Sequence, residues 1–254
     1  MSELRFNLKG WRAWAPDRST REAWQSWAGV RNLSTATEAP DQAEWQQSEA
    51  IPMMLRRRAG TLGQKVIATA LGCGAASDRY ILASRHGELA RTAGILSSLA
   101  DEETLSPAEF SMSVHHAIAG LLSIHTGNRQ GHGAVAAGAD TFAFGFLEAL
   151  TVTATDPDAS VLLIYYDAPL PGEYAELDPS GDLEQPLVLA LRMSAPAGDA
   201  PVYAFDQHPA ESPQSGAAGG TGQAPLDFLR FLLSDAPSAH SAGTQMNWQW
   251  RRVA

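Results

Sequence analysis

Residues 106–150 read SPAEFSMSVHHAIAGLLSIHTGNRQGHGAVAAGADTFAFGFLEAL, and this stretch decides the fold. It opens with a capping box: Ser106 can cap a helix, the following proline suits the first helical position, and Glu109 stands three residues after the cap. Apolar residues then recur at helical spacing. They are Phe110, Val114, Ile118 and Leu121. The sequence therefore predicts a helix that begins at Ser106 and continues to about His125.

A break, a short strand and a second helix follow. Residues 128–133 interrupt the helical pattern, and residues 134–137 are small side chains that predict a short strand. Asp140 can cap the next helix, which we expect to run through Leu147 to about Val152. The order helix, strand, helix within 45 residues is typical of a layered α/β domain.

Helices and strands alternate along the rest of the chain as well. Helical patterns occur at residues 61–71, 88–99 and 226–233, and strand patterns at residues 80–84, 161–166, 186–192 and 246–253. The sequence therefore predicts one α/β domain over residues 51–254, with four or five strands. Between residues 209 and 225 the chain is rich in glycine, serine and alanine, which predicts a flexible loop within this domain.

The first 50 residues differ from the rest by their tryptophans. Five of the seven tryptophans lie there: Trp11, Trp14, Trp24, Trp27 and Trp45. Trp24 and Trp27 stand three residues apart, so they share one face if this stretch is helical. Such a face has to be buried against this chain or a partner, and we expect residues 1–50 to form a packed N-terminal arm.

Composition and charge exclude several classes of protein. The chain has 254 residues, of which 44% are hydrophobic, and its formal net charge is −10. The apolar fraction excludes a disordered chain, and the acidic charge disfavours binding to nucleic acid. No apolar stretch is long enough for a membrane span, and no secretory signal is visible. We therefore expect a cytoplasmic globular protein.

Motifs for catalysis and metal binding are missing from the sequence. It contains no GxSxG nucleophile elbow, no GxGxxG and no GxxxxGK[ST]. Cys73 is the one cysteine, which excludes an internal disulfide and a cysteine-rich zinc site. It follows a helix instead of opening one, and the helix dipole there disfavours a thiolate. His115 and His116 are adjacent and diverge on a helix, so we predict neither a metal site nor a cofactor.

Several short motifs occur in order between about residues 50 and 170. They are Arg56-Arg57-Arg58 with Leu62-Gly63, Ala83-Ser84-Arg85-His86-Gly87-Glu88, Ala119-Gly120, Ser123-Ile124, Gly127, Gly131, Ala134 to Gly138, and Glu148-Ala149. Together they resemble the N-terminal half of β-ketoacyl synthases, which have the thiolase fold. The resemblance implies a thiolase-like half of layered helices and sheet. In that family a short strand leads to the nucleophilic cysteine, which stands at the mouth of a buried helix.

The chain departs from this family at the nucleophile itself. Gly138-Ala139-Asp140-Thr141 stands where the cysteine is expected, and Asp140 is the aligned residue within one or two positions. A carboxylate is a poorer nucleophile than a thiolate, and helix capping alone explains an aspartate at this position. The family's two catalytic histidines belong to the second half of its fold, which is largely absent here. The resemblance therefore implies no catalytic residue in this chain.

Relatives of this kind are chain length factors, which pair with an active β-ketoacyl synthase and help to shape the acyl tunnel. The short chain with its tryptophan-rich arm resembles the factors of aryl polyene biosynthesis, a polyketide-type elongation of fatty acyl chains. Residues implied to contact the partner subunit are Ala134, Val135, Ala136, Ala137 and Gly138. Residues implied to line the tunnel or its gate are Phe110, Met112, His115, His116 and Phe142. The acyl carrier protein is expected to dock on the active partner, and thus to involve this chain only indirectly.

Two other functions remain open from the sequence. One is a scaffold or acyl-carrier-binding module without a tunnel role, in which the apolar gate candidates are ordinary core residues. The other is an enzyme acting on thioesters, with Asp140 or a histidine as its reactive group. The sequence does not specify the product length, the starter unit or the partner ketosynthase.

Overall fold

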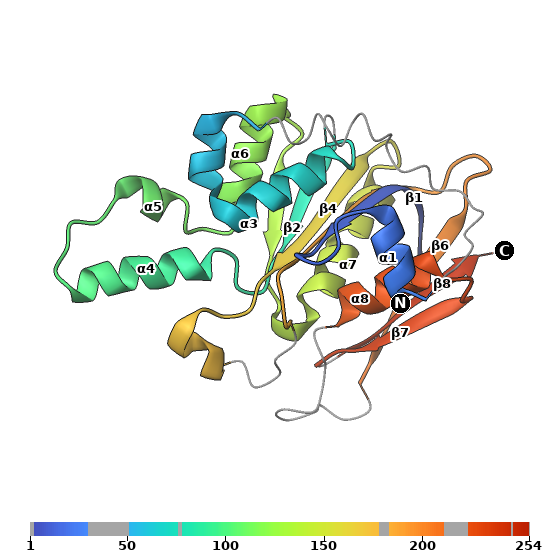
Figure 1. Cartoon of the computed structure of the whole chain (residues 1–254). Helices are drawn as coiled ribbons and strands as arrows, with labels where there is room; N and C mark the ends of the chain where they lie inside the picture. Colours follow the sequence, from blue (N-terminus) through green and yellow to red (C-terminus); the bar gives the residue numbers. More distant parts are fainter. Residues whose placement is uncertain are drawn as a thin grey trace.

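The computed structural model describes residues 3–29, 51–75, 78–177, 183–210, 223–244 and 246–253. Its centre is an eight-stranded sheet with the strand order β3-β2-β4-β5-β1-β6-β8-β7 (Figure 1). The strands are β1 (Leu4–Trp14), β2 (Arg79–Ala83), β3 (His132–Val135), β4 (Ser160–Asp167), β5 (Leu187–Ser194), β6 (Val202–Pro209), β7 (Ser238–Ala242) and β8 (Met246–Val253). The helices are α1 (Arg21–Trp27), α3 (Met53–Leu71), α4 (Leu89–Ala100), α5 (Pro107–Ser111), α6 (Ala117–Thr126), α7 (Thr141–Thr155) and α8 (Ala224–Leu233), with 3₁₀ turns η1 (Gly138–Asp140) and η2 (Gly172–Leu177).

Side chains of the central strands alternate between two hydrophobic cores, because successive residues of a strand point to opposite faces of the sheet. In β4, Leu163 and Tyr165 belong to the core under α1, α7 and α8, whereas Leu162 and Ile164 belong to the core under α3 and α6. Figure 1 shows these two sets of helices on opposite sides of the sheet. The predicted layered α/β architecture is therefore observed.

The N-terminal strand is the largest difference from the sequence prediction. β1 lies between β5 and β6 in the interior of the sheet, so residues 4–14 form a core strand instead of part of an arm. Polar residues hide this strand in the sequence. Asn7 is fully buried because its side chain bonds to the backbone of residues 197, 200 and 201, and the Arg12 guanidinium donates to the carbonyl of Gly72.

The short helix α1 confirms the expected pairing of two tryptophans. Trp24 is buried, and its ring meets the ring of Trp27 edge to face at a centroid distance of 5.3 Å. The indole N–H of Trp24 donates to the carbonyl of Ala13 in β1 at 3.0 Å, which fixes the helix against the sheet. Trp45 and most of the glycine-rich loop of residues 209–225 lie outside the described residues.

The long helix predicted from Ser106 to His125 is divided in two. The predicted cap is present, since the Ser106 hydroxyl accepts from the backbone N–H of Glu109, but α5 ends at Ser111 and α6 begins only at Ala117. The Ser111 hydroxyl donates to the carbonyl of Pro107 at 2.8 Å, and a serine that bonds locally to the backbone competes with helix continuation. The apolar spacing across the gap is thus coincidental.

The strand of small residues is observed two residues earlier than predicted. β3 covers His132–Val135, so Ala136 and Ala137 follow the strand, and Gly138 begins the turn η1. β3 pairs in parallel with β2 at one end of the sheet order. Among the described helices, none is long and apolar enough to cross a membrane.

Candidate functional site

The turn before α7 contains Asp140, the residue for which the resemblance implies the position of the nucleophile. Gly138 has φ +58°, a conformation that glycine adopts without strain. The Thr141 hydroxyl closes the turn, because it accepts from the N–H of Ala137 at 2.9 Å and donates to the carbonyl of Gly138 at 2.7 Å. This local bonding starts the helix without help from the Asp140 side chain.

Asp140 stands at the N-cap of α7, as predicted, but its carboxylate forms long-range hydrogen bonds and no capping bond. Asp140 is buried, and its two oxygens accept from the indole N–H of Trp248 and the backbone N–H of Thr244, each at 2.9 Å. These donors belong to β8 and to the turn between β7 and β8. Because a buried donor without an acceptor is costly, the carboxylate stabilises the contact between the start of α7 and the far end of the sheet.

Gly243 leaves just enough room for this arrangement. A Cβ atom at this position would lie 1.9 Å from Oδ1 of Asp140 and 2.4 Å from the carbonyl oxygen of Met246. The backbone of the β7–β8 turn therefore approaches the carboxylate more closely than any residue with a side chain permits.

The space beside this helix start is small. A pocket of about 20 Å³ is lined by Arg85, His86, Thr141, Phe142, Tyr165 and Asp167, among others. A volume of this size holds a water molecule at most.

A buried carboxylate at the end of β4 organises the opposite wall of this pocket. Oδ1 of Asp167 accepts from the Ser84 hydroxyl at 3.1 Å and from the N–H of His86 at 3.2 Å, and its Oδ2 accepts from the N–H of Arg85 at 2.8 Å. Burial raises the pKa of Asp167 above its ordinary value, although the backbone N–H groups act in the opposite direction. Sequence analysis did not single out Asp167. An aspartate directly after a fully buried strand was the signal that could have found it.

Cys73 lies away from this site. Its side chain belongs to the core under α3 and α6, whereas α7 packs on the opposite face of the sheet. The thiol is buried, donates to the carbonyl of Ala190 at 3.7 Å, and has its pKa raised to about 12 by burial. A thiol in this state is a poor nucleophile.

The structure does not bring the five gate candidates together in one cluster. Phe142 is buried among the aromatic rings of the core under α7 and α8, and Met112 is buried in the core on the other face of the sheet. Phe110 is 65% exposed on α5. His116 is exposed, and its ring lies 5.2 Å from the ring of His132 in β3.

His115, the fifth candidate, contacts the loop after β2. Its Nε2 lies 3.2 Å from the carbonyl oxygen of Ser84, and its ring fills the space beside Gly87, where an added Cβ would lie 2.9 Å from the imidazole. The side chain thus joins the α5–α6 connection to the loop that Asp167 organises.

The strand β3 has one unpaired side within the described part of the sheet. The carbonyls of Gly131 and Val135 accept from the N–H groups of Tyr80 and Ser84 at the two ends of β2. Because backbone groups of successive residues in a strand point to opposite sides, the N–H and carbonyl of Ala134 point away from β2. This edge can pair with a further strand.

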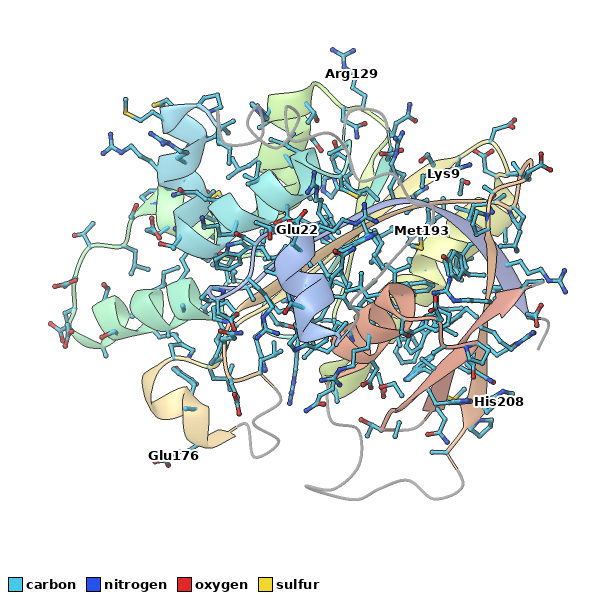
Figure 2. The ribbon with its side chains drawn as sticks, turned by 45° about the vertical axis from the view of Figure 1, so that its right-hand side comes forward. Lys9, Glu22, Arg129, Glu176, Met193 and His208 are labelled. Atoms are coloured by element: carbon cyan, nitrogen blue, oxygen red, sulfur yellow. The ribbon has the colours of Figure 1, made fainter. Side chains whose placement is uncertain are left out.

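Side chains in the described ranges do not form a cluster of three or more histidine, cysteine or acidic residues suited to a metal ion. Figure 2 shows the side chains of the described residues, among them the exposed Glu22 and Glu176 and the buried Met193.

Comparison with known proteins relates this geometry to a family. The family model "Beta-ketoacyl synthase, N-terminal domain" matches residues 24–251. No curated protein sequence matches the chain significantly.

Solved structures give the same result. A chain of the ketosynthase (ApeO) in complex with its chain length factor (ApeC) from Xenorhabdus doucetiae is 27% identical with a TM-score of 0.78, and the match covers 98% of this chain and 100% of that one. The ishigamide ketosynthase/chain length factor has a TM-score of 0.60 at 12% identity, covering 81% of this chain and 67% of that one. A β-ketoacyl synthase from Burkholderia phymatum has a TM-score of 0.55 at 10% identity, and the match covers 92% of this chain and 71% of that one. These neighbours confirm the predicted fold, which is one half of a thiolase-like fold. The family model matches most of the chain, so the chain belongs to the β-ketoacyl synthase N-terminal domain family.

Proposed function

We propose that this chain is a non-catalytic chain length factor that pairs with an active β-ketoacyl synthase. The observation that carries the proposal is the start of α7: the resemblance aligns Asp140 with the family's nucleophile, and both carboxylate oxygens of Asp140 accept hydrogen bonds from the β7–β8 region. The match to a chain of the Xenorhabdus ketosynthase and chain length factor complex supports the proposal, because it covers 98% of this chain and 100% of the matched chain.

The open edge of β3 is the proposed centre of the contact with the ketosynthase. In this arrangement the interface contains Ala134, Val135, Ala136, Ala137 and Gly138. The backbone of Ala134 is available for pairing. The small side chains of these residues permit the close approach of two backbones. Such an interface also removes the exposed strand edge, which is otherwise a site of aggregation.

The same interface would cover apolar side chains that are exposed in this chain. No residue of α4 or α5 is buried, yet Leu96 and Leu99 on α4 are about half exposed and Phe110 on α5 is 65% exposed. Large exposed apolar side chains that lie close together are typical of a surface that binds another protein.

The residues proposed for the tunnel or its gate have different roles. They are Phe110, Met112, His115, His116 and Phe142. Phe110 and His116 are exposed and could reach a tunnel shared with the partner. Met112 and His115 would act by fixing the segment that carries Phe110 and His116, and Phe142, in the core on the opposite face of the sheet, would act through the start of α7. The proposed reaction is elongation of an aryl polyene or related polyketide on an acyl carrier protein in the cytoplasm, with the carrier docked on the ketosynthase.

A proline substitution in β3 tests the pairing. Ala134→Pro removes the outward N–H and leaves the bonds from β2 to Gly131 and Val135 in place. We expect a tagged variant to lose the co-expressed ketosynthase, whereas the matched Ala134→Val variant, which keeps the N–H, retains it. Circular dichroism of both variants checks that they are folded. Full retention of the ketosynthase by a folded Ala134→Pro variant would show that β3 is not the contact.

A further inference from the structure

The helices α4 and α5 are held to the rest of the molecule by few buried contacts. Figure 1 shows both helices projecting from the sheet, and neither contains a buried residue. A cavity of about 330 Å³ lies at the base of this projection and is lined by residues 59–62, 86–91 and 168–171. Within α4 and α5 no side chain is buried, and Met112, directly after α5, anchors the segment that carries Phe110 in the core under α3 and α6.

One polar side chain spans this junction. Arg91 of α4 is 12% exposed, and its guanidinium contacts one residue of α3, one of α5 and the N-cap residue of α4 itself. Its Nη2 donates to the carbonyl of Arg58 in α3 at 3.0 Å, its Nη1 donates to the Glu109 carboxylate in α5, and its Nε lies 3.6 Å from the Glu88 carboxylate. The planar guanidinium offers donors in several fixed directions at once, which a lysine ammonium does not reproduce.

The backbone of α3 is shaped to meet this arginine. Gly60 has φ 66° and ψ −179°, so α3 is kinked at this residue. The carbonyl of Arg58 receives the Arg91 donor. A Cβ at position 60 would lie 3.2 Å from Nη2 of Arg91, so the glycine leaves room for the guanidinium.

The far end of the same segment has a second attachment. His115 lies against Gly87 and the carbonyl of Ser84, in the loop that the Asp167 carboxylate holds. Phe110 and Met112 stand between this contact and the Arg91–Glu109 pair. The segment from Glu109 to His115 is thus attached at both ends to the residues 84–91.

We propose that Arg91 is a positioning residue that sets the place of Phe110, and thereby the length of the acyl chain made by the complex. The inference rests on the proposed function, because it requires that this segment border the acyl tunnel. Arg91 touches no reacting atom. It acts by fixing α5 against α3 and α4.

The test uses the co-expressed complex of the full chain with its ketosynthase, and measures the length distribution of the acyl products. We expect Arg91→Gln to leave the complex intact and to shift the mean length by at least one extension unit. Arg91→Lys should fail to restore the original distribution, since an ammonium cannot meet Arg58, Glu109 and Glu88 together. Glu109→Gln, at a half-exposed position, should give a smaller shift in the same direction.

Controls separate the possible failures. Arg56→Gln removes an exposed arginine of α3 and should leave product length unchanged. If Phe110→Ala shifts product length but Arg91→Gln and Glu109→Gln do not, the positioning role of Arg91 is refuted and the proposed function stands. If the wild-type chain forms no complex with the ketosynthase, the proposed function fails first. Restoration of wild-type length by Arg91→Lys would also overturn the inference, because it would show that a single charge is sufficient.

Discussion

Removal of the Asp140 carboxylate should strongly destabilise the protein, although the site lacks catalytic chemistry in this account. Asp140→Ala deprives the Trp248 indole and the Thr244 N–H of their shared acceptor, and both hydrogen bonds are 2.9 Å long. A hydrogen bond to a charged group contributes about 1.5–3 kcal/mol. The expected loss is therefore about 3–6 kcal/mol if neither donor finds a substitute. That is a large part of the roughly 5–15 kcal/mol that stabilises a typical domain.

Asp140→Asn should give an intermediate loss. The amide keeps one acceptor oxygen and turns an NH₂ group toward the other donor, so we expect a loss of about 1.5–3 kcal/mol. Urea unfolding of the purified protein, followed by tryptophan fluorescence, measures both variants against wild type. Asp158→Ala, at an exposed position, serves as the control and should stay within about 0.5 kcal/mol of wild type.

The critical outcome is that the free energy of unfolding decreases in the order wild type, Asp140→Asn, Asp140→Ala. A loss below about 1 kcal/mol for Asp140→Ala would refute a structural role for the carboxylate. Activity of the isolated chain on acyl thioesters, abolished by Asp140→Asn, would instead favour a catalytic role.

Three further predictions follow from burial and close contacts. Gly243→Ala places a Cβ 1.9 Å from Asp140 Oδ1, so thermal unfolding should show a loss of stability at least as large as for Asp140→Asn. Cys73, with its pKa raised to about 12, should not react with iodoacetamide at pH 8 until the protein is unfolded, and rapid labelling of the native protein would contradict its burial. Burial also raises the pKa of Glu88 above 4.5, so ionisation of Glu88 costs more in the folded than in the unfolded state. As pH rises from 4.5 through the raised pKa, the melting temperature of wild type should therefore fall relative to that of Glu88→Gln. A difference in melting temperature that stays constant with pH would contradict this prediction.

Local sequence patterns predicted the helices and strands whose residues are apolar at regular spacing or bond to near neighbours in sequence. β4 and β5 were visible as continuous apolar runs because both of their faces are covered by helices. The capping box at Ser106 was visible because its hydrogen bond spans three residues. The strands β1, β6 and β7 were missed, because polar residues such as Asn7 and Arg12 find partners that no local pattern reveals.

The candidate site illustrates the same limit. Its position followed from the resemblance, and Thr141 completes the turn locally. The partners of Asp140 are more than 100 residues away in sequence, so only the folded sheet shows that the carboxylate binds Trp248 and Thr244. The division between α5 and α6 was also missed: Ser111 bonds locally to Pro107, and His115 in the connection contacts Ser84 on a different segment. Long-range polar contacts, more than hydrophobic periodicity, separate the structure from its sequence prediction.

Co-purification tests whether this chain assembles with a ketosynthase. This chain alone carries the tag, the β-ketoacyl synthase encoded nearest to it is co-expressed, and size-exclusion chromatography with light scattering gives the mass of the captured species. The account predicts a stable complex with one copy of each chain. A well-behaved monomer or homodimer that leaves the ketosynthase in the flow-through would contradict it.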